Sequence, residues 1–141
     1  MMSSELLSLI YNKALDILSR REHSAHELKL KLHKKYEAIS EIEEVITKLE
    51  SNNLLNDFRF AETYARIRKR KGFGPNKIHY ELTNKGIKES ISNEIISAED
   101  GWGHAALQAF RKKYKDGISE DTKERLKQKT FFIIEVLVLK K

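Results

Sequence analysis

The 141-residue sequence contains no cysteine, one proline and only six glycines. Without cysteine the chain has neither disulfides nor a thiolate metal site, and it suits a reducing compartment. Helix-breaking residues are scarce, while leucine, isoleucine, lysine and glutamate are abundant, which favours helix almost throughout. The composition therefore predicts an all-α protein.

Long apolar segments are also missing. The longest apolar run, Phe131–Leu139, is nine residues long and is interrupted by Glu135. A membrane-spanning helix needs roughly 20 apolar residues. The N-terminal sequence lacks a basic flank followed by a long apolar core, so no signal peptide is predicted. We therefore expect a cytoplasmic protein that makes no membrane contact.

Patterns that support catalysis are scarce as well. The five histidines are scattered, and only His26 and His33 are expected to share a helix, with no second pair to complete a metal site. The chain contains no nucleophile elbow, no P-loop and no dinucleotide-binding glycine pattern. We therefore expect no enzymatic activity, no catalytic residue, no cofactor and no metal.

Part of the sequence repeats itself at an offset of 50 residues. A repeat of this length is typical of stacked helical units that share one core. It favours an extended binding surface over an enzyme built around a single pocket. The aligned pairs are Arg20-Arg21 with Arg70-Lys71, Leu28 with Ile78, Leu32 with Leu82, Lys35 with Lys85, and Glu44-Val45-Ile46 with Glu94-Ile95-Ile96.

Apolar residues at helical spacing divide the chain into three units of three helices each. The expected units are residues 1–55, 56–99 and 100–141. In the first unit, a helix is predicted from Glu5 to Arg21, and the pairs Ser24/Glu27 and Ser40/Glu43 are predicted capping boxes of the next two helices. Stacked repeats contact only their neighbours, so we expect one elongated, curved body.

The second unit is expected to begin with a helix at Asn56 or Asp57 in which Phe58 and Ile67 are among the inward residues. Pro75 suits the first turn of the following helix, where its missing N–H is not needed. Gly86 is expected to end that helix in a left-handed conformation. In the third unit, a helix beginning near Trp102 is expected to end at Gly117.

The net charge of +6 is distributed unevenly. Residues 1–60 carry nine basic and ten acidic residues, residues 61–100 carry eight and six, and residues 101–141 carry ten and five. The basic excess therefore lies in the second and third units. Such a balance favours a polyanion or an acidic protein as partner.

Cations cluster at the expected end of the first helix of each unit. Some of them complement the helix dipole, and the excess indicates either contact with phosphates or an acidic protein groove, or an ordinary solvated surface. Phe73 and Tyr114 lie among the cations and could stack on bases or, for Tyr114, pack in the core. Trp102 suits core packing or an interface. The predicted partner- or DNA-binding residues are Arg20, Arg21, Arg66, Arg68, Lys69, Arg70, Lys71, Lys77, Arg111, Lys112 and Lys113.

Three segments resemble the bacterial RecX regulatory proteins. They are ALDILSRREHSAHELKLKL (residues 14–32), NLLNDFRFAETYARIR (residues 53–68) and KGFGPNKIHYELTNKGI (residues 71–87). The resemblance implies three tandem three-helix repeats and a modulator of the recombinase RecA. Family members are thought to lie in the groove of the RecA–single-stranded-DNA filament, limiting its growth and suppressing ATP hydrolysis, strand exchange and repressor cleavage. The implied partners are the RecA filament and single-stranded DNA, contacted directly or through RecA.

The end of the chain departs from this family. The family pattern predicts a charged helix, a turn of Lys/Arg-Gly-aromatic and a last amphipathic helix there. In this chain Thr130 is followed by FFIIEVLVLKK instead. Three explanations of this terminus stay open: a native, a truncated or a frame-altered end. Its apolar residues predict either weak self-association or poor order. Two other functions remain open, a general nucleic-acid-binding helical protein and a helical scaffold for unrelated protein partners.

Overall fold

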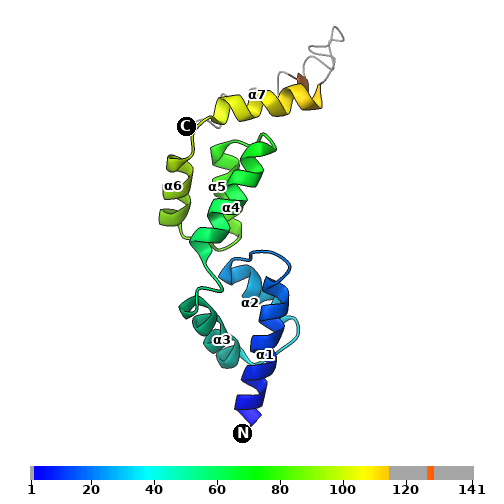
Figure 1. Ribbon diagram of the computed structural model, residues 1–141, viewed down its shortest axis with the longest axis vertical. Coiled ribbons are helices and arrows are strands. Elements are labelled where there is room, and N and C mark those ends of the chain that lie inside the picture. The colour runs from blue at the N-terminus through cyan, green and yellow to red at the C-terminus, as the bar shows by residue number, and fades with distance from the viewer. Residues whose placement is uncertain (1, 115–126, 129–141) are drawn as a thin grey trace. The chain divides into compact units, whose positions relative to one another are not determined.

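The computed structural model describes residues 2–114 and 127–128, apart from the side chains of residues 2 and 3 (Figure 1). Within these ranges the chain forms seven α-helices and no strand, which confirms the all-α prediction. None of the described helices combines the length and the apolarity that crossing a membrane requires. The helices are α1 (Met2–Leu18), α2 (Ala25–His33), α3 (Ile39–Ser51), α4 (Asp57–Arg70), α5 (Pro75–Asn84), α6 (Glu89–Ala98) and α7 (Trp102–Lys113).

The chain divides into two compact units. The first contains residues up to Ala61 together with Lys85–Ile87, and the second contains Glu62–Asn84 and the described residues from Lys88 onward. Helix α4 therefore starts in the first unit and ends in the second. The predicted boundaries of three repeats and the elongated, curved body remain predictions.

In the first unit, α1, α2 and α3 pack against one another around a single apolar core. Each helix contributes residues three, four or seven positions apart, so one face of each is buried. Truncating one of the large core side chains to alanine typically costs about 2–5 kcal/mol. The buried core residues are Ile10, Ala14, Leu28, Leu32, Ile42, Val45, Ile46, Leu49 and Leu55.

One of the two predicted capping boxes is confirmed. The Ser24 hydroxyl accepts a hydrogen bond from the Glu27 N–H at 3.1 Å, and the Glu27 carboxylate accepts one from the Ser24 N–H at 3.1 Å. The box at Ser40 and Glu43 is wrong, because α3 begins at Ile39 and the Ile42 N–H already bonds the carbonyl of Ala38. Ser40 thus lies inside the first turn, where its hydroxyl does not cap the helix.

The structure also corrects two helix ends. Helix α1 ends at Leu18 rather than at Arg21, and α7 ends at Lys113, before the predicted break at Gly117. The predictions for residues 115–126 and 129–141, including the apolar segment Phe131–Leu139, lie outside the described residues.

In the second unit, the pattern of buried apolar residues recurs at an offset of 50 residues. Helix α5 packs against α6, and Ile78, Leu82 and Ile95 are buried as their counterparts in the first unit are. Pro75 is the first residue of α5, as predicted. The repeat seen in the sequence is therefore a repeat of core positions.

Two predicted inward residues of α4 are wrong. Phe58 is 38% exposed and Ile67 is 44% exposed. The buried side of α4 runs through Phe60, Ala61 and Ala65. At about 100° per residue, Phe58 and Ile67 each lie roughly a quarter turn from the middle of that side.

Gly86, between α5 and α6, has a φ of +78°. A β-carbon at this position would lie 2.4 Å from the Cβ of His26. Beside it, the Ser24 hydroxyl donates a 2.7 Å hydrogen bond to the carbonyl of Lys85. Glycine is therefore required here by backbone conformation and by space, as the sequence predicted for conformation alone.

Candidate functional site

The cation cluster of α4 consists of Arg66, Arg68, Lys69 and Arg70 in the last turns of the helix and Lys71 directly after it. Arg66, Arg70 and Lys71 are exposed, and none of the three has an ion-pair partner among the described residues. Cations at a helix C-terminus interact favourably with the helix dipole. Within these six residues, three positive charges therefore form no ion pair with a carboxylate of the described chain.

Arg68 has a structural role. Its guanidinium binds the Glu81 carboxylate through two hydrogen bonds, Nε to Oε1 at 3.0 Å and Nη2 to Oε2 at 2.8 Å. The same guanidinium lies 3.7 Å from the centre of the Phe73 ring, and the Lys77 ammonium lies 4.8 Å from it. A bidentate ion pair and a cation–π contact together fix the turn between α4 and α5.

Lys69 also has an ion-pair partner within the second unit. Its ammonium lies 2.8 Å from the Glu99 carboxylate, just after α6, and 5.6 Å from the centre of the Trp102 ring. The side chains of Lys69 and Glu99 are only 19% and 23% exposed. This ion pair therefore connects the end of α4 to the segment between α6 and α7.

Arg20 and Arg21 lie beyond the end of α1. Arg20 pairs with Asp16 at 3.3 Å, while both terminal nitrogens of Arg21 reach the Glu27 carboxylate, at 3.3 and 3.2 Å. Asp16 is half exposed, so the Arg20 pair is weak and its charge faces water.

The pKa of the Glu27 carboxyl group is shifted far from its ordinary value. Burial acts to raise its pKa, but hydrogen bonds from Arg21 and from the Ser24 N–H, with the charge of Lys85, outweigh burial and lower the pKa to about 2. Glu27 therefore remains ionised at neutral pH and holds the start of α2, Arg21 and Lys85 together.

Cations also occupy the last turn of α7. Arg111, Lys112 and Lys113 are exposed, and the Lys113 ammonium lies 5.5 Å from the centre of the Tyr114 ring. Tyr114 in turn packs against Phe110, with ring centres 5.0 Å apart. Tyr114 is thus half-buried against its own helix.

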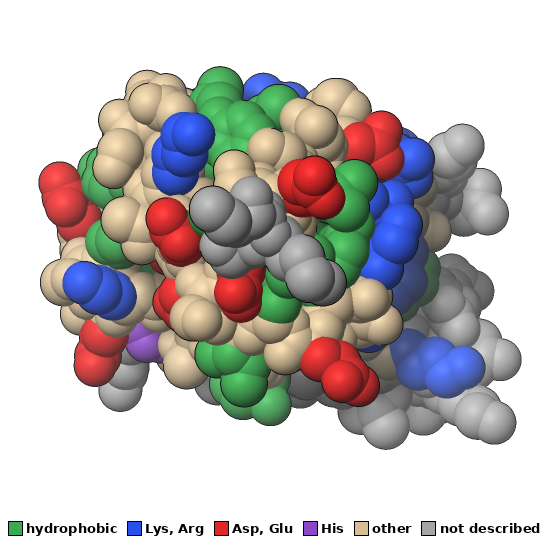
Figure 2. Space-filling model, turned by 90° about the horizontal axis from the view of Figure 1, so that it is seen from below, with side chains coloured by type: hydrophobic (Ala, Val, Ile, Leu, Met, Phe, Trp, Pro, Cys, Tyr) green, Lys and Arg blue, Asp and Glu red, His purple; other side chains and the backbone are tan. Residues whose placement is uncertain are grey.

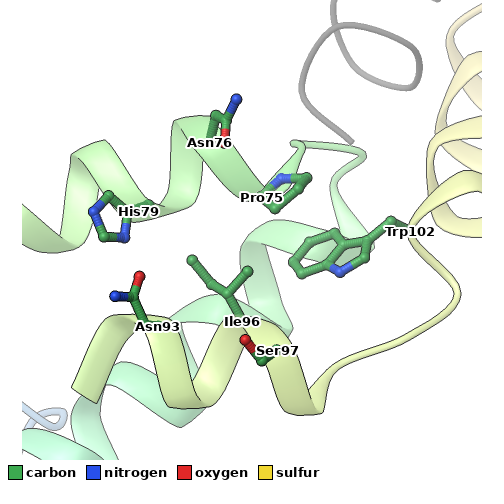
Figure 3. Close-up of a pocket in the computed structure, with 7 residues that line it drawn as sticks. All are labelled: Pro75, Asn76, His79, Asn93, Ile96, Ser97 and Trp102. Atoms are coloured by element: carbon green, nitrogen blue, oxygen red, sulfur yellow. The ribbon is translucent and has the colours of Figure 1, made fainter. Parts of the chain in front are cut away.

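Trp102 borders an open pocket of about 450 Å³ between α5 and α6 (Figure 3). The indole points from the start of α7 towards Pro75 and Ile96 (Figure 3). His79 on the same pocket has its Nδ1 2.7 Å from the hydroxyl of the buried Ser92. Trp102 is half-buried among residues of the second unit, and its alternative role as an interface anchor stays a prediction.

Sequence patterns alone did not identify the counter-ions of the α4 cluster. Glu81 and Glu99 are 13 and 30 residues away from their partners Arg68 and Lys69, beyond the reach of helical periodicity. Figure 2 shows one face of the molecule, on which carboxylates are scattered among basic and apolar side chains. Among the described residues, no group of three or more potential ligands is arranged to hold a metal ion.

Two segments of the chain match models of a known protein family. Residues 11–49 match the model of the first three-helix domain of RecX, and residues 56–95 match that of the second. A regulatory protein RecX of Legionella pneumophila (strain Corby) is 36% identical over 124 residues, which cover 87% of this chain and 83% of that protein. A regulatory protein RecX of Mannheimia succiniciproducens is 34% identical over 113 residues, 79% of this chain and 74% of that one.

Solved structures have the same fold. The crystal structure of RecX from Lactobacillus salivarius superposes with a TM-score of 0.71 at 24% identity, over 94% of this chain and 88% of that chain. A second crystal structure of regulatory protein RecX gives a TM-score of 0.73 at 19% identity, over 96% and 68%. With both domain models matched and relatives above 30% identity over most of their length, the chain belongs to the RecX family of regulatory proteins.

Proposed function

We propose that this protein binds the RecA–single-stranded-DNA filament and modulates RecA, mainly by inhibiting its ATPase, strand-exchange and co-protease activities. It acts in the cytoplasm, without a cofactor and without catalysis of its own. Membership of a family of regulatory proteins supports this role. A filament of protein on single-stranded DNA also offers the anionic surface that a basic chain favours.

The observation that carries the proposal is the exposed cation set Arg66, Arg70 and Lys71. These side chains have no ion-pair partner among the described residues, whereas their neighbours Arg68 and Lys69 are paired. Unpaired exposed cations contribute little to folding. They are available for phosphates or carboxylates of a partner, and we assign them that contact.

Arg111 and Lys112 of α7 extend the proposed contact, since they too are exposed cations at a helix C-terminus. Lys77 is exposed and lies over Phe73, so it remains a candidate at the edge of the surface. Arg68 and Lys69 have carboxylate partners in the chain, and their contact with the partner stays a prediction.

Binding to preformed RecA filaments on single-stranded DNA tests the proposal. The triple variant Arg66→Ala, Arg70→Ala, Lys71→Ala should bind more weakly and with a flatter salt dependence. The slope should fall by up to about 2, since each lost phosphate contact on a single strand removes about 0.7. The control, Lys34→Ala, Lys35→Ala, Lys88→Ala, removes the same charge from exposed positions elsewhere and should bind like the wild type.

Three other results would count against the proposal. Equal binding by both triple variants would remove the α4 cations from the interface. Equally tight binding to single-stranded DNA with and without RecA would favour a general nucleic-acid-binding protein. Binding to neither RecA nor DNA would favour a scaffold for other proteins.

A further inference from the structure

Four of the six residues that border a hollow of about 410 Å³ in the first unit are lysine or arginine. It lies where the end of α1, the α1–α2 connection and α2 meet. Every charged residue of its lining is a cation. The lining residues are Lys13, Ile17, Arg20, Arg21, His23 and Lys31.

The carboxylates nearest to these cations do not neutralise them. Asp16 is shared between Lys13, at 3.7 Å, and Arg20, at 3.3 Å. Glu27 is shared between Arg21 and Lys85. Each carboxylate therefore faces two cations, and Lys31 adds a further positive charge with no carboxylate partner among the described residues.

His23 positions the charge of Lys31. Its ring is 1% exposed, with Nδ1 2.9 Å from the carbonyl of Arg21 and Nε2 2.8 Å from the Lys31 ammonium. A carbonyl only accepts and an ammonium only donates, so Nδ1 carries the proton and Nε2 accepts from Lys31. Burial lowers the pKa of His23, and the charges of Arg21 and Lys31 act in the same direction, outweighing the hydrogen bond to the Arg21 carbonyl and the charge of Glu27, which act to raise the pKa.

In the second repeat, the positions equivalent to this hollow are filled by an internal ion pair. At the offset of 50 residues, Lys31 corresponds to Glu81 and His23 corresponds to Phe73. There the guanidinium of Arg68 covers the Phe73 ring and binds the Glu81 carboxylate. The second repeat therefore supplies its own anion at this position.

The first repeat lacks both the arginine and the glutamate that form this ion pair in the second repeat. Leu18 stands at the position of Arg68, and a lysine stands at the position of the glutamate. The equivalent place consequently remains an open hollow with cations on several sides. An external anion would have there the role that Glu81 has in the second repeat.

We propose that this hollow binds a phosphate group, with Lys13, Arg20 and Lys31 as its ligands and His23 as the residue that positions Lys31. Phosphate suits the site because its oxygens accept several charge-assisted hydrogen bonds from different directions. The site takes one phosphate of a nucleic-acid backbone or a free phosphate group.

The inference rests on the proposed function only for the source of the phosphate, which would be the single-stranded DNA of the filament. Its test uses no RecA. Failure of the phosphate site would leave the effect on RecA unaffected, and failure of the RecA effect would leave the phosphate site unaffected.

The test is an NMR titration of the full chain with inorganic phosphate and, separately, with a short oligothymidylate. Resonances of Lys13, Arg20, His23 and Lys31 should shift with either ligand. Lys31→Glu, which copies the second repeat, should abolish these shifts, weaken oligonucleotide binding severalfold and flatten the salt slope by about 0.7. Lys34→Glu, with the same charge change at an exposed position one turn away, should behave like the wild type.

Arg20→Gln provides a second variant that cannot fail through misfolding of the core, because the Arg20 side chain is 74% exposed. It should weaken phosphate binding as well. Shifts with the oligonucleotide alone identify a DNA-backbone site, and shifts with inorganic phosphate alone identify a free-phosphate site; both support the proposal. Absence of shifts, equal losses in Lys31→Glu and Lys34→Glu, or equally tight binding of polyglutamate at the same residues would overturn it.

Discussion

At the scale of single residues, ion pairing decides which cations of a basic run are free to bind a partner. The five cations from Arg66 to Lys71 look equivalent in the sequence. The structure separates them, because Arg68 and Lys69 have carboxylate partners and the other three have none among the described residues. The position of the cluster was therefore predictable from the sequence, but the division within it was not.

Arg68→Ala should lower the free energy of unfolding by about 2 kcal/mol, because it removes two charge-assisted hydrogen bonds and leaves Glu81 without its partner. Urea denaturation followed by circular dichroism measures this change. Arg66→Ala removes an exposed cation from the same helix and should change stability by less than about 0.5 kcal/mol. Equal effects of the two substitutions would show that the Arg68–Glu81 pair has no structural role.

Glu27 should make stability depend on acid pH. Its pKa falls from 4.5 to about 2 on folding, so its contribution is complete above pH 4.5 and is lost as the pH falls towards 2. Glu27→Gln should be less stable at pH 7 and should lose less stability between pH 4.5 and 2 than the wild type. Thermal melts across this range measure the difference, with Glu50→Gln, at an exposed position, as control. An identical pH profile in all three proteins would contradict the Glu27 network.

At the scale of helices, periodicity predicted the elements well and their ends less well. The buried positions of α2, α3 and α5 repeat every three or four residues, so these helices were visible in the sequence. The Ser24 cap was found because its partner Glu27 is three residues away, whereas Ser40 matched the same pattern without capping α3. A local pattern cannot show that a helix begins two residues earlier, since tertiary packing sets that boundary.

Gly86→Ala should destabilise the protein by at least about 1–2 kcal/mol, the usual cost of a left-handed conformation for a residue with a β-carbon. The close approach of His26 should add to that cost. Gly103→Ala is the matched control, because a β-carbon there has open space and lies in α7, where alanine is favoured. The control should not lower the melting temperature, and a similar loss in both variants would exclude a special role for Gly86.

At the scale of the whole molecule, the repeat links fold and function. Leu28/Ile78 and Leu32/Leu82 are buried in both copies, which the sequence alignment predicted because core positions tolerate only apolar exchange. The polar positions around them diverge, as Lys31 and Glu81 do. Their different environments depend on contacts between helices, which periodicity within one helix cannot reveal.

Whether this protein regulates RecA is best tested by the rate of ATP hydrolysis by RecA on single-stranded DNA, measured with and without this protein. The rate should fall as the protein is added. The Arg66→Ala, Arg70→Ala, Lys71→Ala variant should need a higher concentration for the same effect. A rate that stays constant at every concentration of folded wild-type protein would contradict the proposal that this chain regulates RecA.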